Sequence, residues 1–191
     1  MELIKKVFDK IKKDKFIKAQ IIVIFFSLIL GTLLHFTYEW SGRNLFVASF
    51  SAVNESVWEH LKLAFFPMII AAIIEYFFVK DEVNNYVEAK TIGIFTAISF
   101  IVVLFFTYSG IIGTSIIVID ILIFIASIIL GEYVAYKLMK REDESTYITE
   151  ILSIIILVFL LICFIVFTYL PPEVNLFRDV IKGVYGIGNI L

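Results

Sequence analysis

The chain has 191 residues, of which 61% are hydrophobic and only 18% are charged, and its mean hydropathy is +0.99. A soluble domain is nearer about 45–50% apolar and about a quarter charged, so this composition excludes an ordinary water-soluble protein. The formal net charge of −2 gives no basic field that would attract nucleic acid, and the surroundings that the composition implies are a lipid bilayer.

Five apolar runs are long enough to cross a membrane, since a helix needs about 20 residues to span the hydrocarbon. Backbone groups in lipid must be satisfied within the segment, which favours helices. The predicted fold is therefore all-α, a polytopic membrane helix bundle with five transmembrane helices. The predicted spans are residues 16–40, 54–79, 90–108, 111–138 and 147–169. The domain prediction is a basic amphipathic segment at 1–15, a transmembrane domain at 16–169 and an extracytoplasmic tail at 170–191.

Lysine and arginine are distributed unequally between the two sides, and cytoplasmic loops carry the excess of these residues. One side has Lys5, Lys6, Lys10, Lys12, Lys13, Lys15, Lys18, Lys80, Lys90, Lys137, Lys140 and Arg141. The other side has Arg43, Lys62, Arg178 and Lys182. This asymmetry predicts a cytoplasmic N-terminus and an external C-terminus. The frequent lysine and isoleucine favour a bacterial protein, hence a multi-pass protein of the cytoplasmic membrane.

The basic segment at 1–15 has apolar residues at helical spacing, among them Leu3, Val7 and Ile11. It is either a helix on the anionic inner leaflet or simply a topology signal. Between the first two spans, residues 45–50 are apolar but too few to cross, so residues 41–53 form either a re-entrant turn or an interfacial helix. Both pairs of alternatives stay open.

One polar segment enters the second span directly and reads Asn54-Glu55-Ser56-Val57-Trp58-Glu59-His60-Leu61-Lys62. Ionisable groups in a membrane helix cost roughly 2.5–3.5 kcal/mol each on insertion scales unless they are paired, hydrated or bound to something. This cost makes the segment the default functional site.

Helical geometry predicts which side chains converge there. Lys62 lies about 11 Å down its helix, and Asp120, nine residues after Ile111, lies roughly 13 Å down its own. We therefore expect Lys62 to pair with Asp120 across the second and fourth spans. The predicted outward-facing polar pocket is formed by His35, Glu39, Asn54, Glu55, Trp58, Glu59, His60, Lys62 and Asp120.

The acidic residues at the inner ends of the spans have a simpler interpretation. Glu75 and Glu132 have Lys80 and Lys137 within reach, and Glu150 also follows a basic loop. They are expected to lie in the headgroup region.

No metal is expected, because His35 and His60 lie on different helices and no zinc or di-iron ligand spacing is present. No cofactor is expected, since the chain has no dinucleotide or phosphate-binding fingerprint. The single cysteine, Cys163, lies in an apolar run and reads as a small core residue.

The segment Asn-Glu-Ser-Val-Trp-Glu-His-Leu-Lys at 54–62, together with the ending Pro171-Pro172, Leu176-Phe177 and Gly183 to Ile187, resembles a family of small uncharacterised bacterial membrane proteins. The likeness covers most of the chain. It implies that the polar segment and the tail are shared features of such proteins, and it implies no activity.

The favoured hypothesis for function is the binding of a small solute or ion, with proton-coupled transport as one form of it. The alternatives are a membrane-embedded enzyme acting on a lipid-linked substrate, with Glu59 or Asp120 as acid or base, and an accessory subunit without chemistry. The sequence does not determine the ligand or the oligomeric state.

Overall fold

The computed structural model describes residues 15–141 and 145–187. Five long helices dominate them: α2 (Lys15–Trp40), α4 (Val57–Val79), α5 (Tyr86–Ile112), α6 (Ile117–Met139) and α7 (Tyr147–Tyr169). Two elements are short, the helix α3 (Leu45–Ala48) and the 3-10 helix η1 (Asn175–Phe177). Each long helix is apolar and long enough to cross a membrane, which confirms the prediction of an all-α, five-span membrane protein. The amphipathic segment predicted at 1–15 lies almost wholly outside the described residues.

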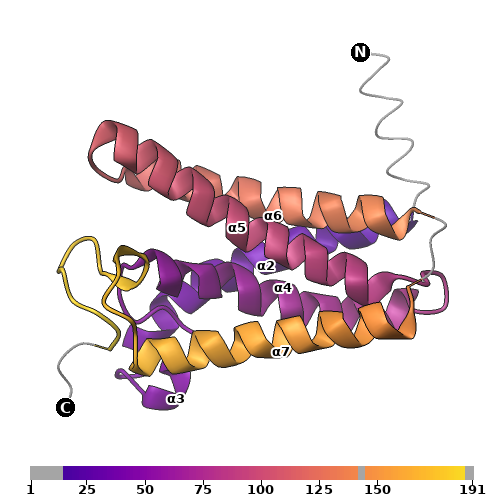
Figure 1. Cartoon of the computed structure of the whole chain (residues 1–191), viewed down its shortest axis with the longest axis horizontal. Coiled ribbons are helices and arrows are strands. Elements are labelled where there is room, and N and C mark those ends of the chain that lie inside the picture. Colours follow the sequence, from indigo (N-terminus) through magenta and orange to yellow (C-terminus); the bar gives the residue numbers. More distant parts are fainter. Residues whose placement is uncertain (1–14, 142–144, 188–191) are drawn as a thin grey trace.

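The long helices run lengthwise side by side, with α5 and α6 on one side of the bundle and α7 on the other (Figure 1). At one end α2, α5 and α7 finish and α4 and α6 begin. This end also carries α3 and the C-terminal tail, residues 170–187, and we call it the tail end. The opposite end is called the N-terminal end.

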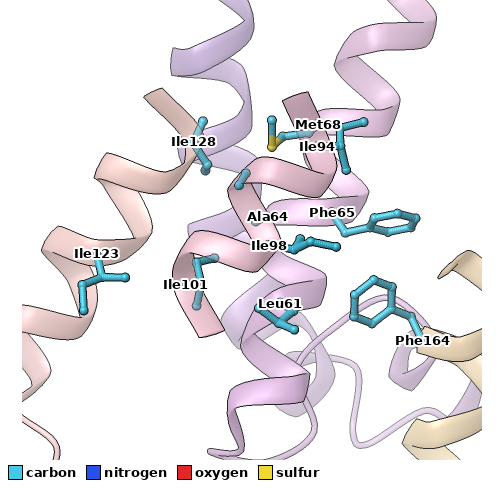
Figure 2. Packing of buried hydrophobic residues seen from close by; sticks show 11 residues of the cluster. Leu61, Ala64, Phe65, Met68, Ile94, Ile98, Ile101, Ile123, Ile128 and Phe164 are labelled. Carbon is cyan, nitrogen blue, oxygen red and sulfur yellow. The ribbon is translucent and has the colours of Figure 1, made fainter. Parts of the chain in front are cut away.

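Helix α4 is the central helix, and more than half of its most apolar window is buried inside the protein, against 17% for α7. Its side chains Leu61, Phe65 and Met68 pack with Ile94 and Ile98 of α5, while Phe164 of α7 closes the cluster from the other side (Figure 2). Outward-facing apolar residues of the other helices contact lipid in the membrane. The charged residues Glu59, Lys62 and Glu75 of α4 are accordingly buried in the protein.

The junction between α5 and α6 differs from the prediction. Helix α5 continues to Ile112, where Gly113 adopts a left-handed conformation (φ +86°) and ends it. Helix α6 then begins at Ile117 instead of 111. Asp120 consequently lies in the first turn of α6, about 4–5 Å from the helix start by the rise per residue, and the predicted depth of 13 Å is wrong.

Two glycines bring α5 and α6 into close contact. A Cβ added to Gly93 would lie 2.6 Å from the carbonyl oxygen of Gly131, and a Cβ on Gly131 would lie 2.6 Å from that of Gly93. Small residues allow backbones to approach in this way in membrane proteins. The contact places Lys90, about one turn before Gly93, beside Glu132.

The expectation that Glu75 and Glu132 face the headgroups is wrong. Both side chains are buried, and both contact the ammonium of Lys90, at 2.6 Å and 2.5 Å. Lys80 and Lys137, the expected partners, are exposed. The carboxylates face the interior because their positions on α4 and α6 point toward α5. The depth of a residue along its helix does not determine whether its side chain points toward the protein interior or toward the surface.

Candidate functional site

The polar segment forms the start of α4 at the tail end. Ser56 caps the helix, since its side chain accepts a hydrogen bond from the amide of Glu59 at 3.3 Å. Asn54 holds the approach to the cap by accepting from the amide of Ser56 at 2.8 Å. The side chains that follow point in three directions: Trp58 toward the tail, Glu59 and Lys62 into the protein, and His60 toward α2.

Glu59 and Lys62 form a fully buried ion pair, with Lys62 Nζ 2.6 Å from Glu59 Oε2. The ammonium also donates to the carbonyl of Ala48 in α3 and to the hydroxyl of Thr168 in α7, each at 2.8 Å. The three donors of Lys62 are thereby satisfied.

Glu59, the acidic partner, also has further hydrogen-bond partners. The Thr168 hydroxyl lies 3.0 Å from Glu59 Oε1, and the amide of Val53 donates to Glu59 Oε2 at 3.1 Å. We call this set, made of Glu59, Lys62, Thr168 and the backbone of Ala48 and Val53, the buried clamp. It joins α4, α3, α7 and the loop between α3 and α4.

The predicted pairing of Lys62 with Asp120 is wrong. Lys62 pairs within its own helix, three residues from Glu59. Asp120 accepts a hydrogen bond from the hydroxyl of Tyr108 in α5, and it takes part in no ion pair with the described residues. Tyr108 also accepts from the amide of Ile116, so Asp120 and Tyr108 tie together the turn between α5 and α6.

Glu39 lies at the end of α2 and pairs with Arg43, whose Nε is 3.2 Å from the carboxylate. Both side chains are largely exposed. The hydrogen bond and the charge of Glu39 raise the pKa of Arg43 above its usual value. Such an exposed pair contributes little to stability.

The tail docks on the polar segment. The side-chain amide of Asn54 donates to the carbonyl of Gly186 at 2.7 Å, and the amide of Glu55 donates to Asp179 at 3.1 Å. Phe177 of η1 lies against Trp58, with ring centroids 4.8 Å apart. These contacts hold the tail against the start of α4.

Asp179 is the polar centre of the docked tail. Its other oxygen accepts from the amides of Ile181 and Lys182, each at 2.7 Å. Burial pushes the pKa of Asp179 upward, but the backbone hydrogen bonds from Lys182, Glu55 and Ile181 outweigh burial and leave its pKa below the usual value. The carboxylate is therefore held ionised against the start of α4.

The remaining three residues form a second, more open group: His35 from α2, His60 from α4 and Glu55 just before α4. His60 Nε2 lies 3.4 Å from Glu55 Oε2, and His35 Nε2 lies 4.0 Å from Glu55 Oε1. The two imidazole rings are 5.2 Å apart. One ligand atom from each residue lies within 4.8 Å of the other two, a spacing that suits a shared metal ion. We call these residues the His–Glu–His group.

The sequence analysis expected no metal because His35 and His60 lie on different helices, and the structure shows that this separation does not keep them apart. Spacing along the chain separates His35 from His60 by 25 positions, yet the packing of α2 against α4 brings them together. The sequence held part of the evidence for this group. The chain has two histidines, and each lies near the end of a predicted span on the same side of the membrane.

The nine predicted site residues thus lie in distinct surroundings rather than in one pocket. Glu59 and Lys62 belong to the buried clamp, Asn54 and Trp58 hold the tail, and His35, Glu55 and His60 form the His–Glu–His group. Glu39 and Asp120 lie apart in pairs of their own.

Two functional contacts were missed by the sequence analysis. Thr168 was missed although it is a polar residue near the end of a very apolar span. Asp179 was missed because the tail has no periodic pattern that would point to it.

The chain matches the protein family described as "Family of unknown function (DUF6512)" over residues 5–187. No curated protein and no solved structure matches it.

Proposed function

We propose that this chain, which belongs to the Family of unknown function (DUF6512), is an integral membrane protein that binds a divalent transition-metal ion at its tail end. The ligands are His35, Glu55 and His60. The observation that carries the proposal is the convergence of their ligand atoms within 4.8 Å from two helices and the residue that precedes the cap of α4. This narrows the favoured hypothesis of solute or ion binding to one class of ion.

The set of donors suits zinc. Zn²⁺ accepts imidazole nitrogen and carboxylate oxygen, and two histidines with one glutamate are a known three-ligand set that leaves a further position open. At bond lengths of about 2.1 Å, neighbouring ligands of a tetrahedral ion lie roughly 3.4 Å apart. The His60–Glu55 distance already has this value, whereas His35 Nε2, 4.0 Å from Glu55, must move closer to complete the set.

His60 is oriented as a ligand. Its Nδ1 lies 2.8 Å from the carbonyl of Ser56, which can only accept, so Nδ1 carries the proton. Nε2 then presents its lone pair to the centre of the group. Metal-binding histidines commonly use a backbone carbonyl in this way to fix the tautomer. His35 leaves Nδ1 buried without a partner among the described residues, so one of its ring nitrogens is available as well.

Ion binding is better supported than the enzymatic alternative. The three ligand side chains are about a third exposed, which leaves room for water or a further ligand. Glu59, the acid or base that the enzymatic alternative requires, uses both oxygens within the buried clamp. Asp120 bonds to Tyr108 in the turn between α5 and α6.

Zinc titration of the purified protein tests the proposal. We expect stoichiometric binding, measured by competition with a chromogenic chelator and by elemental analysis. Glu55→Gln and His60→Ala should each weaken the affinity by more than about 100-fold, since even residues that only hydrogen-bond to a metal ligand are worth about 10–100-fold.

Glu39→Gln is the matched control. Glu39 is an acidic residue at the same end of α2, four residues from His35, but it pairs with Arg43 and lies outside the His–Glu–His group. Its replacement should leave zinc affinity unchanged. The proposal would be overturned by a wild-type protein that binds no zinc, which is the result expected from the sequence. It would also be overturned by variants that bind zinc as tightly as the wild type.

The orientation of the protein is part of the proposal. The asymmetry of lysine and arginine supports a cytoplasmic N-terminal end and an external tail end in a bacterial cytoplasmic membrane. The His–Glu–His group then takes its ion from the external side.

Cysteine labelling in intact cells tests this orientation. Single cysteines at Lys80 and Lys182, both exposed, are introduced after Cys163→Ala removes the native thiol. We expect a membrane-impermeant maleimide to label position 182 and not position 80. Labelling of position 80 alone would reverse the orientation.

A further inference from the structure

A second group of ionisable side chains lies at the N-terminal end, away from the metal-binding proposal. Glu75 of α4, Lys90 of α5 and Glu132 of α6 are all buried. Lys90 Nζ is 2.6 Å from Glu75 Oε2 and 2.5 Å from Glu132 Oε2, so two carboxylates flank one ammonium. Gln20 of α2 and Tyr86 of α5 complete this set, which we call the Lys90 cluster.

The groups that face the carboxylates do not balance their charge. The titratable groups next to Glu132 are Lys90 and Tyr86 of α5 and Glu75 of α4, and α2 contributes only the neutral amide of Gln20. With both carboxylates ionised, the cluster carries one negative charge in excess. An uncompensated charge inside a membrane domain is expensive, so a positive species is expected to bind.

The hydrogen bonds indicate where the imbalance lies. Both oxygens of Glu75 have a partner: Gln20 Nε2 donates to Oε1 at 2.5 Å, and Oε2 lies 2.6 Å from Lys90 Nζ. The hydroxyl of Tyr86 also lies 3.0 Å from Oε2, although it is nearer the carbonyl of Ala72, at 2.7 Å. Glu132 Oε1 is buried and has no partner among the described residues. A charged oxygen without a donor is more costly to bury than a neutral one.

We propose that the Lys90 cluster binds one exchangeable proton, held between Glu75 and Glu132. The proton makes the cluster neutral while Lys90 remains charged. It would give the membrane domain an acid–base group inside its helices, as proton-coupled processes require. This inference goes beyond the proposed metal site and does not depend on it.

Counting charges predicts a distinctive pattern among variants. Glu75→Gln leaves Glu132 with Lys90, and Glu132→Gln leaves Glu75 with Lys90. Each variant is neutral without a bound proton, so each should lose it. Lys90→Met leaves two carboxylates without a cation, so both should be protonated and the number of bound protons should double.

Infrared spectroscopy of the protein in detergent tests the pattern through the carbonyl stretch of protonated carboxyl groups. At neutral pH we expect one such band in the wild type, its loss in Glu75→Gln and in Glu132→Gln, and a twofold larger band in Lys90→Met. Transfer into D₂O should shift the band, because the proton exchanges. Glu150→Gln, at the start of α7 and outside the cluster, is the control and should keep the band.

Several outcomes would overturn the proposal. They are the absence of the band in wild type, its persistence in both single glutamine variants, and a band that does not shift in D₂O. A wild type without the band whose thermal stability rises with sodium or potassium concentration would assign the site to a metal cation. If Lys90→Met fails to fold, the two glutamine variants, which are isosteric and neutral, still decide the question.

Discussion

Lys62→Met should destabilise the protein by roughly 3–5 kcal/mol, the penalty for removing one partner of a buried ion pair. The change strands Glu59, whose carboxylate is fully buried, and it leaves the carbonyl of Ala48 without its donor. Because Lys62 joins α4 to α3 and α7, the loss should be seen in the thermal unfolding of the protein in detergent.

A double-mutant cycle with Glu59→Gln measures the interaction itself. Replacing both partners removes both charges, so the double variant should be clearly more stable than the sum of the single effects predicts. The matched cycle pairs Lys62→Met with Asp120→Leu. It should be additive, since Asp120 bonds to Tyr108 and not to Lys62. Additivity in the Lys62–Glu59 cycle would contradict the buried clamp.

Gly186→Ala should release the tail from the start of α4. Gly186 has a φ of +57°, and an added Cβ would lie 2.8 Å from the carbonyl oxygen of Thr168 and 2.9 Å from Pro171 Cγ. A non-glycine residue in a sparsely populated backbone region costs about 1–3 kcal/mol, which corresponds to roughly a 5- to 150-fold larger fraction of undocked tail. The carbonyl of Gly186 would also lose its bond from Asn54.

Limited trypsin digestion measures this release, because Arg178 and Lys182 lie in the tail. Cleavage under conditions of fast opening and closing follows the open fraction, so its rate should rise in proportion. Gly110→Ala is the control: a Cβ at Gly110 has no neighbour within 4 Å, and the residue lies in α5. Equal cleavage rates in Gly186→Ala and wild type would show that the tail is not held as described.

The position of the polar segment at 54–62 could be predicted from the sequence, whereas the partners of its side chains could not. It was identified from the cost of placing ionisable residues at the start of a membrane helix, and the structure gives its side chains specific partners. Asn54 and Trp58 hold the tail, Glu59 and Lys62 form the buried clamp, and His60 lies against Glu55. The location could be predicted because the cost of inserting an ionisable side chain into a membrane helix follows from its residue type and its place in an apolar run.

The errors concern a helix boundary and contacts between helices. Asp120 was placed too deep because the start of α6 depends on the left-handed Gly113, which the apolar pattern conceals. Glu75 and Glu132 were assigned to headgroups because the sequence does not reveal that Gly93 and Gly131 bring α5 against α6, with Lys90 between the carboxylates.

The sequence by itself determined the class of protein, the number of spans and the position of the polar segment. These follow from composition and from the length of apolar runs, which are properties of each segment in isolation. Only the tertiary structure decided that Lys62 reaches Ala48 and Thr168, that His35 meets His60 and that two carboxylates share Lys90. The rise and rotation of a helix fix depth and direction within that helix, whereas a contact between helices depends on how their faces pack.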